Sequence, residues 1–271
     1  MPRLPADLHM HSKLCGHAVG EIGENVERAI ALGHEAAGFS FHLPIRIPVP
    51  YKVNVTREEL DLLATEIERL RAAFGGRIPI LFGGEADYLP GNEHEVEELA
   101  SAYPFDYLIG SVHFIGEWAF DHPASVADYA RWDRRKLYET YVGLVRDAIG
   151  TGLFDVVGHV DLIKKFGHRL EGDWSDIITA LCTEMRRHDV AMEINTAGFD
   201  KPVGEQYASE EIVRLSFAAG VPILFGSDAH APGEVGRYFP QAAALARSAG
   251  YEEYAWFKGR KRSLRPIIAE G

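Results

Sequence analysis

Residues 78–85 (IPILFGGE) carry the pattern that decides the fold. The run 78–83 is short and apolar on both faces, and the carboxylate Glu85 follows it. A strand whose two faces are both covered, as in a parallel sheet, has this continuous apolar character. Residues 57–74, ahead of the run, show a helical pattern that opens with a capping box from Thr56 to Glu59. The stretch is therefore typical of a helix leading into a buried strand with a polar group at its carboxyl end.

The same alternation of apolar run and helical pattern continues along the whole chain. The strand-like runs are 4–9, 36–41, 78–83, 105–113, 154–159, 190–195 and 221–226. The helical patterns lie near 21–33, 57–74, 93–102, 125–150, 174–188, 209–219 and 235–248. Strict alternation predicts an α/β fold with a parallel sheet, and seven units fit either a distorted seven-stranded barrel or a doubly wound sheet. In both folds the ligand site lies at the carboxyl ends of the strands.

Composition narrows the classes of protein that this chain can belong to. The 271 residues contain no evident repeat and no Gly/Ser linker, so we expect one domain spanning 1–271. A net charge of −12 argues against a nucleic-acid-binding surface, and no apolar run is long enough for a transmembrane helix or signal peptide. Two cysteines fit a reducing compartment, so we expect a cytoplasmic protein. The oligomeric state stays open.

Metal-binding side chains gather where the predicted strands end. These residues are His9, His11, His17, His42, Glu85, His113, His159, Asp228 and His230. One such histidine is commonly a hydrogen-bonded core residue, but nine groups at one edge favour metal binding, because they are costly to bury otherwise. Residues two apart on a strand point the same way, so His9 and His11 can share an ion. Imidazoles and carboxylates without a thiolate suit zinc, manganese or iron, and nine ligands suffice for two or three ions.

These motifs also occur in the order found in a known family. Residues 7–12 (DLHMHS), His17, Glu85, 111–113 (SVH), 158–159 (GH) and 227–230 (SDAH) resemble the polymerase and histidinol phosphatase (PHP) superfamily over nearly the whole chain. Residues 109–115, 160–166 and 195–205 are most similar to the monofunctional histidinol-phosphate phosphatases. The resemblance implies a distorted (β/α)7 TIM-like barrel, and hydrolysis of L-histidinol phosphate to L-histidinol and phosphate in histidine biosynthesis.

The resemblance further implies a centre of three divalent ions, which would be zinc, iron or manganese. Transferred by position, the first ion would be held by His9, His11, Glu85 and Asp228, the second by Glu85, His113 and His159, and the third by His17, His42 and His230. Such ions neutralise a phosphate dianion and activate water, which explains how an acidic chain can bind this substrate. Cys15, between His11 and His17, is interpreted as a packed loop residue.

Other residues are candidates for contacts with the substrate. Arg237 can clamp a phosphoryl oxygen, and Lys164, Lys165 or Lys201 can reach the phosphate from loops. The leaving alkoxide needs a proton donor, for which Asp161, Asp121 and His122 are candidates. Carboxylates that can bind the substrate amine are Glu117, Asp121 and Glu205. The Pro-rich loop 44–51, after His42, is a candidate wall over the site.

Three other functions are weighed against this hypothesis. The same metal set can serve another phosphomonoesterase or a cyclic nucleotide phosphodiesterase. A proofreading-linked module of a polymerase would need a basic face, which a net charge of −12 does not supply. Amide hydrolases on similar barrels commonly use a carboxylated lysine, and no lysine ends a predicted strand here.

Overall fold

A six-stranded parallel sheet forms the centre of the molecule in the structure, a computed structural model that describes residues 3–268. Its strands follow one another in chain order: β1 (Ala37–His42), β2 (Ile80–Asp87), β3 (Tyr107–Ser111), β6 (Val156–Val157), β7 (Ala191–Asn195) and β8 (Ile223–Gly226). The register pairs His42 with Glu85 at the carboxyl ends of β1 and β2. The expected α/β fold with its polar strand ends at one edge is therefore confirmed.

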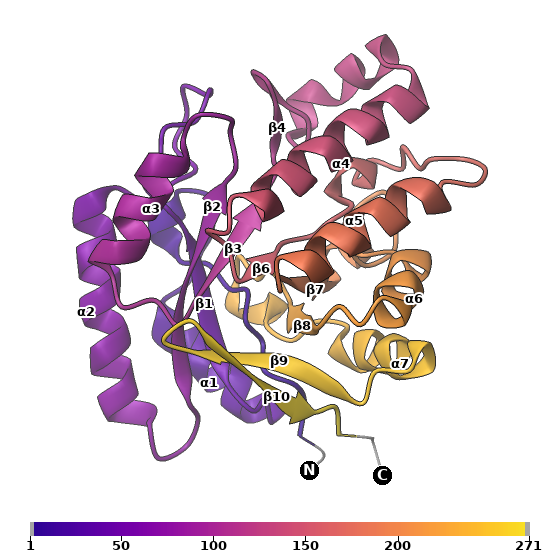
Figure 1. The fold of residues 1–271 in the computed structure, drawn as a ribbon. Helices are drawn as coiled ribbons and strands as arrows, with labels where there is room; N and C mark the ends of the chain where they lie inside the picture. The colour runs from indigo at the N-terminus through magenta and orange to yellow at the C-terminus, as the bar shows by residue number, and fades with distance from the viewer. Residues whose placement is uncertain (1–2, 269–271) are drawn as a thin grey trace.

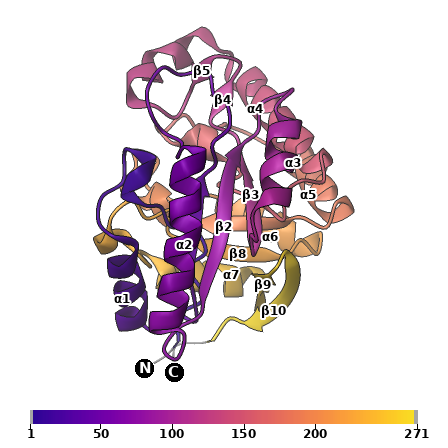
Figure 2. The same ribbon diagram turned by 90° about the vertical axis from the view of Figure 1, so that its left-hand side faces the viewer.

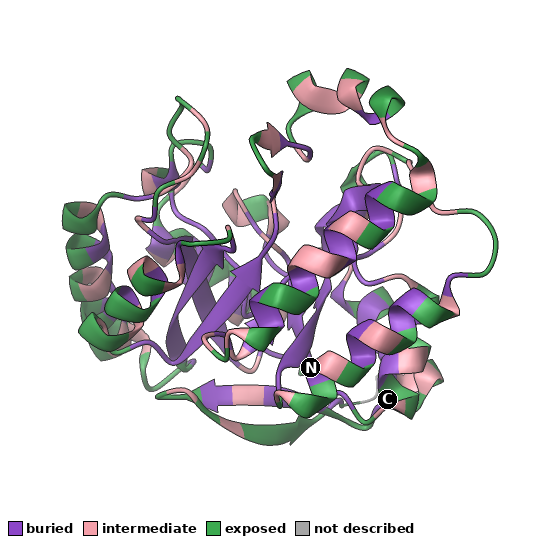
Figure 3. Cartoon of the chain, turned by 45° about the horizontal axis from the view of Figure 1, so that its top comes forward, coloured by how far each residue is buried: buried purple, intermediate pink, exposed green. Residues whose placement is uncertain are grey.

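Helices cover the outer face of this curled sheet (Figures 1 and 2). They are α1 (Ile22–Leu32), α2 (Arg57–Phe74), α3 (Glu93–Ala102), α4 (Arg134–Gly150), α5 (Ser175–Arg187), α6 (Glu210–Ala218) and α7 (Phe239–Ala249). The capping box that begins α2 is present, with Thr56 accepting from the Glu59 backbone and Glu59 from the Thr56 backbone. Figure 3 shows the sheet buried and the helices buried mainly on their inner sides. No helix within residues 3–268 has both the length and the apolar character needed to cross a bilayer.

The first predicted strand, 4–9, is an irregular segment that connects the two ends of the sheet. On one side the Leu8 N–H donates to the Phe225 carbonyl at 3.0 Å, and on the other the Gly38 N–H donates to the Asp7 carbonyl at 2.7 Å. Only isolated bridges form here, at Leu4, Asp7 and Met10. The segment thus takes the place of a seventh strand and closes a TIM-like barrel between β8 and β1, which disfavours the open doubly wound alternative.

Tyr107 illustrates how the interior of the barrel is filled. Its ring is fully buried, and its hydroxyl donates to the Leu8 carbonyl at 2.7 Å. A Cβ atom at Gly83 would lie 2.4 Å from this ring, so the glycine allows the close approach. The contact anchors the irregular N-terminal segment to the sheet, and that segment ends at the candidate ligand His9, with His11 two residues beyond it.

Several elements differ from the expectations. The predicted helix 125–150 is split into a 3₁₀ segment, η2 (Pro123–Arg131), and α4, because Asp133 caps a new helix by accepting from the Lys136 backbone at 2.9 Å. The last helix begins at Phe239 rather than 235, because Tyr238 has a left-handed φ of 56°. Two hairpins had no predicted counterpart: β4 (Phe114–Ile115) with β5 (Trp118–Ala119), and β9 (Glu253–Lys258) with β10 (Lys261–Pro266). Figure 1 shows these hairpins at opposite ends of the barrel.

Candidate metal centre

The nine candidate ligands lie together at the carboxyl edge of the sheet, and Glu85 of β2 is at their centre. Its Oε2 atom is 3.2 Å from His9 Nε2 and 3.1 Å from His42 Nδ1. Its Oε1 atom is 3.1 Å from His159 Nε2 and 3.8 Å from His113 Nε2. The two oxygens thus face two different sets of imidazoles, as a carboxylate that bridges two ions would.

Asp228 is a second carboxylate in this cluster. Its Oδ1 atom lies 3.0 Å from His11 Nε2 and 3.5 Å from His230 Nδ1. Asp228 has a φ of 51°, in the left-handed region that aspartate enters more readily than most non-glycine residues. The carboxylate of Asp7 holds the surrounding loop, because it accepts from the backbone N–H groups of Ser227 at 2.9 Å and Gly236 at 3.0 Å.

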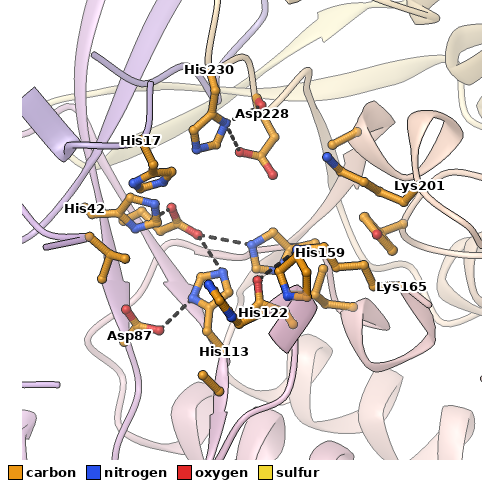
Figure 4. A pocket seen from close by; sticks show the side chains of 18 of the residues that line it. His17, His42, Asp87, His113, His122, His159, Lys165, Lys201, Asp228 and His230 are labelled. Atoms are coloured by element: carbon orange, nitrogen blue, oxygen red, sulfur yellow. Dashed lines mark hydrogen bonds and ion pairs between the residues drawn. The ribbon is translucent and has the colours of Figure 1, made fainter. Parts of the chain in front are cut away.

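Ligand atoms of the cluster form three groups, each within 4.8 Å: His9, His11 and Asp228; Glu85, His113 and His159; and His11, His42 and His230. His17 is not in these groups, but its ring centroid lies 4.8 Å from that of His230 and 5.3 Å from that of His42. Figure 4 shows His17, His42, His113, His159 and His230 turned toward one common space.

Within the cluster, the pKa shifts of His11, His42 and Glu85 favour binding of a divalent ion, whereas at His9 and His113 burial is outweighed by nearby carboxylates, which raise the pKa. Burial and the neighbouring His230 lower the pKa of His11 to about 3, and burial lowers that of His42 well below its ordinary value. Burial alone would raise the pKa of Glu85, but the imidazoles outweigh it and hold that pKa well below the usual range. Neutral imidazoles and ionised carboxylates are the forms that bind zinc, manganese and iron. Cys15 is buried, and burial raises its pKa to about 11.

Two carboxylates that sequence reasoning missed hold the ligands from behind. Asp87 Oδ1 lies 2.6 Å from His113 Nδ1, and Glu193 Oε1 lies 2.6 Å from His9 Nδ1. Burial lowers the pKa of His113, but Asp87 outweighs it and the pKa rises to about 10. Both had a sequence signal: Asp87 follows Glu85 by two residues, so it shares a face of the strand, and Glu193 is a charge inside an apolar run.

A cavity of about 440 Å³ opens above the cluster. Besides the ligands, its lining includes Tyr51, Asp121, His122, Lys165, Lys201 and Arg237. The Asp121 carboxylate lies 3.0 Å from the Lys165 ammonium. Burial raises the pKa of Asp121, but Lys165 and His113 outweigh it, so that pKa lies below its ordinary value and the carboxylate is ionised near neutral pH. Loop 44–51 reaches the cavity through Tyr51, whose ring centroid is 5.2 Å from that of His122.

Arg237 and Lys201 lie at the side of the cavity near Asp228. The Arg237 guanidinium donates to the carbonyls of Ser227 at 3.0 Å and Asp228 at 3.1 Å, and its Nη1 atom pairs with Asp200 at 3.1 Å. Figure 4 shows the Lys201 amine turned into the cavity, toward Asp228. Arg237 therefore braces the ligand-bearing loop, while Lys201 presents its charge to the cavity.

Four other predicted site residues do not line the cavity. The Lys164 ammonium is buried, 2.6 Å from Asp161 Oδ2 and 3.1 Å from Glu205 Oε1, so these three residues form an internal ion cluster. Glu117 is exposed at the turn between β4 and β5. The expected proton donation by Asp161 and the expected substrate contacts of Lys164, Glu205 and Glu117 do not fit these positions.

Known proteins share this fold and much of this sequence. A model of the PHP domain matches residues 7–197. The chain is 39% identical over 262 residues to a probable histidinol-phosphatase of Deinococcus radiodurans, covering 96% of this chain and 98% of that protein. It is 27% identical over 266 residues to the histidinol-phosphatase of Lactococcus lactis, covering 94% of this chain and 95% of that protein.

Solved structures show the same architecture. Histidinol phosphate phosphatase from Lactococcus lactis, in complex with zinc, L-histidinol and phosphate, superposes with a TM-score of 0.83 at 24% identity, covering 95% of this chain and 98% of that one. A histidinol phosphatase structure from Listeria monocytogenes superposes with a TM-score of 0.79 at 23% identity, covering 87% of this chain and 99% of that one. Together with the sequence match, these likenesses place the chain in the PHP domain family.

Proposed function

We propose that this chain is a metal-dependent phosphatase that hydrolyses L-histidinol phosphate to L-histidinol and phosphate. The observation that carries the proposal is the convergence of nine imidazole and carboxylate ligands beneath a cavity of about 440 Å³. A cavity of this size falls in the range of about 300–1,000 Å³ typical of small-molecule sites. The names of the similar proteins supply the substrate.

The ligands would hold three divalent ions, which are zinc, iron or manganese. His9, His11, Glu85 and Asp228 would hold the first, Glu85, His113 and His159 the second, and His17, His42 and His230 the third. The two faces of the Glu85 carboxylate support this division. When bound, the ions neutralise the phosphate charge and lower the pKa of a water molecule that attacks phosphorus.

Lys201 and Arg237 contact the phosphate in this proposal. The Lys201 amine is turned into the cavity and provides a mobile charge for a phosphoryl oxygen. Arg237 fixes the carbonyls of residues 227 and 228, and its guanidinium forms part of the cavity wall beside Asp228. Charge-assisted hydrogen bonds of this kind orient the phosphoryl group for attack.

Asp121 and His122 contact the organic part of the substrate. Asp121 is an anion on the cavity wall, so it is suited to bind the substrate ammonium group rather than to donate a proton. His122 Nδ1 accepts from the Ala124 backbone N–H at 3.2 Å, which leaves the ring proton on Nε2. That N–H can donate a hydrogen bond to the leaving oxygen as negative charge develops on it, and water then supplies the proton that completes the alcohol.

The proposal is tested by measuring metal content and hydrolysis on the same preparation. We expect about three ions per chain, because the ligands form three groups. We also expect hydrolysis of histidinol phosphate to be much faster than hydrolysis of an aryl phosphate. A fully active preparation without transition metal would refute the metal role. Faster hydrolysis of another phosphomonoester or a cyclic nucleotide would assign the same centre to a different phosphoester.

A further inference from the structure

Glu193 joins two parts of the ligand cluster that are distant in sequence. The residue lies in the middle of β7 and its side chain is fully buried. Oε1 is 2.6 Å from His9 Nδ1, on the irregular N-terminal segment. Oε2 accepts from the backbone N–H of His159, just after β6, at 2.8 Å. One carboxylate therefore contacts one candidate ligand through its ring and another through its backbone.

The barrel leaves a space for this carboxylate. A Cβ atom at Gly226, the last residue of β8, would lie 2.1 Å from Glu193 Oε1 and 2.5 Å from His9 Cβ. Any side chain at that position would displace the carboxylate or the ring. A buried carboxylate is costly unless its oxygens are hydrogen bonded, and here both oxygens have donors.

The geometry determines where the proton of His9 lies. An ionised carboxylate only accepts hydrogen bonds, so when His9 is neutral, the form that binds a metal, its ring carries the proton on Nδ1, next to Glu193. The lone pair of Nε2 then faces the cluster, where Glu85 Oε2 lies 3.2 Å away. His159 is held in a strained conformation, with a φ of 22°, and its Nε2 also faces Glu85, at 3.1 Å.

We propose that Glu193 is a positioning residue for the metal centre, fixing the Nδ1–H tautomer of His9 and the backbone of His159 so that both rings present Nε2 to the ions. The inference rests on the proposed metal centre, and it is independent of which phosphoester is the substrate. Carboxylates behind a ligating imidazole fix its tautomer and orientation in many metal sites.

Glu193→Gln tests this with a nearly isosteric side chain. The amide has one acceptor oxygen in place of two, and the His159 N–H can only donate, so that oxygen stays with His159. The amide N–H₂ then faces His9 Nδ1 and donates to it, which moves the ring proton to Nε2. The His9 nitrogen that faces the cluster is thereby blocked without any loss of packing volume.

The readouts are zinc affinity and stoichiometry, measured by titration of the metal-free protein, and the imidazole tautomers of ¹⁵N-histidine-labelled protein. For Glu193→Gln we expect about 10–100-fold weaker binding of at least one ion and a shift of the His9 proton from Nδ1 to Nε2. Asp106→Asn is the matched control, because Asp106 is also buried and accepts from two backbone N–H groups, of Phe82 and Gly259, away from the cluster. It is expected to change stability and leave zinc binding unchanged.

Wild-type zinc binding in the Gln variant, with the His9 proton still on Nδ1, would overturn the inference. If the variant does not fold, the His9 tautomer is measured in the zinc-loaded wild-type protein instead. A His9 proton on Nε2 there would also overturn the inference. Absence of zinc binding by the wild-type chain would instead refute the proposed function, so the two failures are distinguishable.

Discussion

Replacing Lys164 with Met separates a structural from a catalytic role for the internal ion cluster. The Lys164 ammonium lies 2.6 Å from Asp161 Oδ2, with side-chain exposures of only 4% and 2%. It also donates to the Gln206 carbonyl at 2.9 Å. Methionine has a similar length and no charge, so the substitution removes one partner of a buried ion pair and leaves the other. Such losses cost about 3–5 kcal/mol of unfolding free energy.

The loss of unfolding free energy within this range depends on whether Asp161 becomes protonated when Lys164 is removed. Burial raises the pKa of Asp161, and Lys164 opposes the rise. Without the ammonium, the pKa rises further, and protonation relieves part of the penalty. We therefore expect a loss of about 3 kcal/mol at pH 8, or about 6–12 °C in Tm at the 2–4 °C per kcal/mol typical of chains of about this size.

The sign of the pH dependence follows from the same residue. A carboxyl group with a folded pKa above its unfolded value destabilises the protein once the pH exceeds the unfolded value, and the penalty grows until the pH passes the folded pKa. Because this pKa is higher in Lys164→Met than in the wild type, the stability gap between the two proteins should be smaller at pH 5 than at pH 8.

Urea unfolding at both pH values and steady-state kinetics at 25 °C test this reasoning. We expect kcat and KM within about twofold of the wild type, since neither residue lines the cavity. The double variant Lys164→Met, Asp161→Asn should recover part of the lost stability, because the neutral amide no longer leaves a buried charge unpaired. A stability loss below about 1 kcal/mol, or a large fall in kcat with unchanged stability, would refute the structural role.

Three further outcomes are expected. Lys201→Met should lower kcat/KM for histidinol phosphate about 10–100-fold with an unchanged Tm, because a charge-assisted contact worth about 1.5–3 kcal/mol is lost; an unchanged kcat/KM would exclude the phosphate contact. Asp121→Asn should raise KM for histidinol phosphate but not for an aryl phosphate, which lacks the ammonium group; equal effects on both would contradict amine binding. Chelation should abolish hydrolysis and lower Tm, with both restored by zinc or manganese; activity that survives complete chelation would argue against the metal centre.

The candidate metal centre could be predicted because of a property of parallel sheets. His42, Glu85 and His159 lie more than forty residues apart in sequence, yet each stands at or after the carboxyl end of a strand. In a parallel sheet these ends share one edge, so locating the strands was sufficient to bring the ligands together. An irregular first strand did not change this, because segment 4–9 follows the same direction between β8 and β1.

Residues beyond the strand ends could not be placed in this way. Asp161 follows His159 by two residues, which on a strand would give both the same direction. Instead the chain turns at His159, and η3 (Leu162–Lys164) follows directly, so the Asp161 side chain points to Lys164 beneath the cavity wall. The directions of loop side chains depend on such turns. Turns leave no periodic pattern in the sequence, so these directions could not be predicted from it.

The distribution of charge explains how a strongly acidic chain can accommodate a phosphate dianion. Three cations on the cavity wall already have carboxylate partners, since Lys52 pairs with Glu59, Lys165 with Asp121 and Arg237 with Asp200. Each pair adds almost no net charge, so Lys201 contributes most of the positive charge that these side chains offer. One ammonium at a partly solvated site cannot balance a dianion, because water screens its interaction strongly. Most of the compensating charge must therefore come from ions held by the ligand cluster, which makes substrate binding, and not the chemical step alone, dependent on the metal centre.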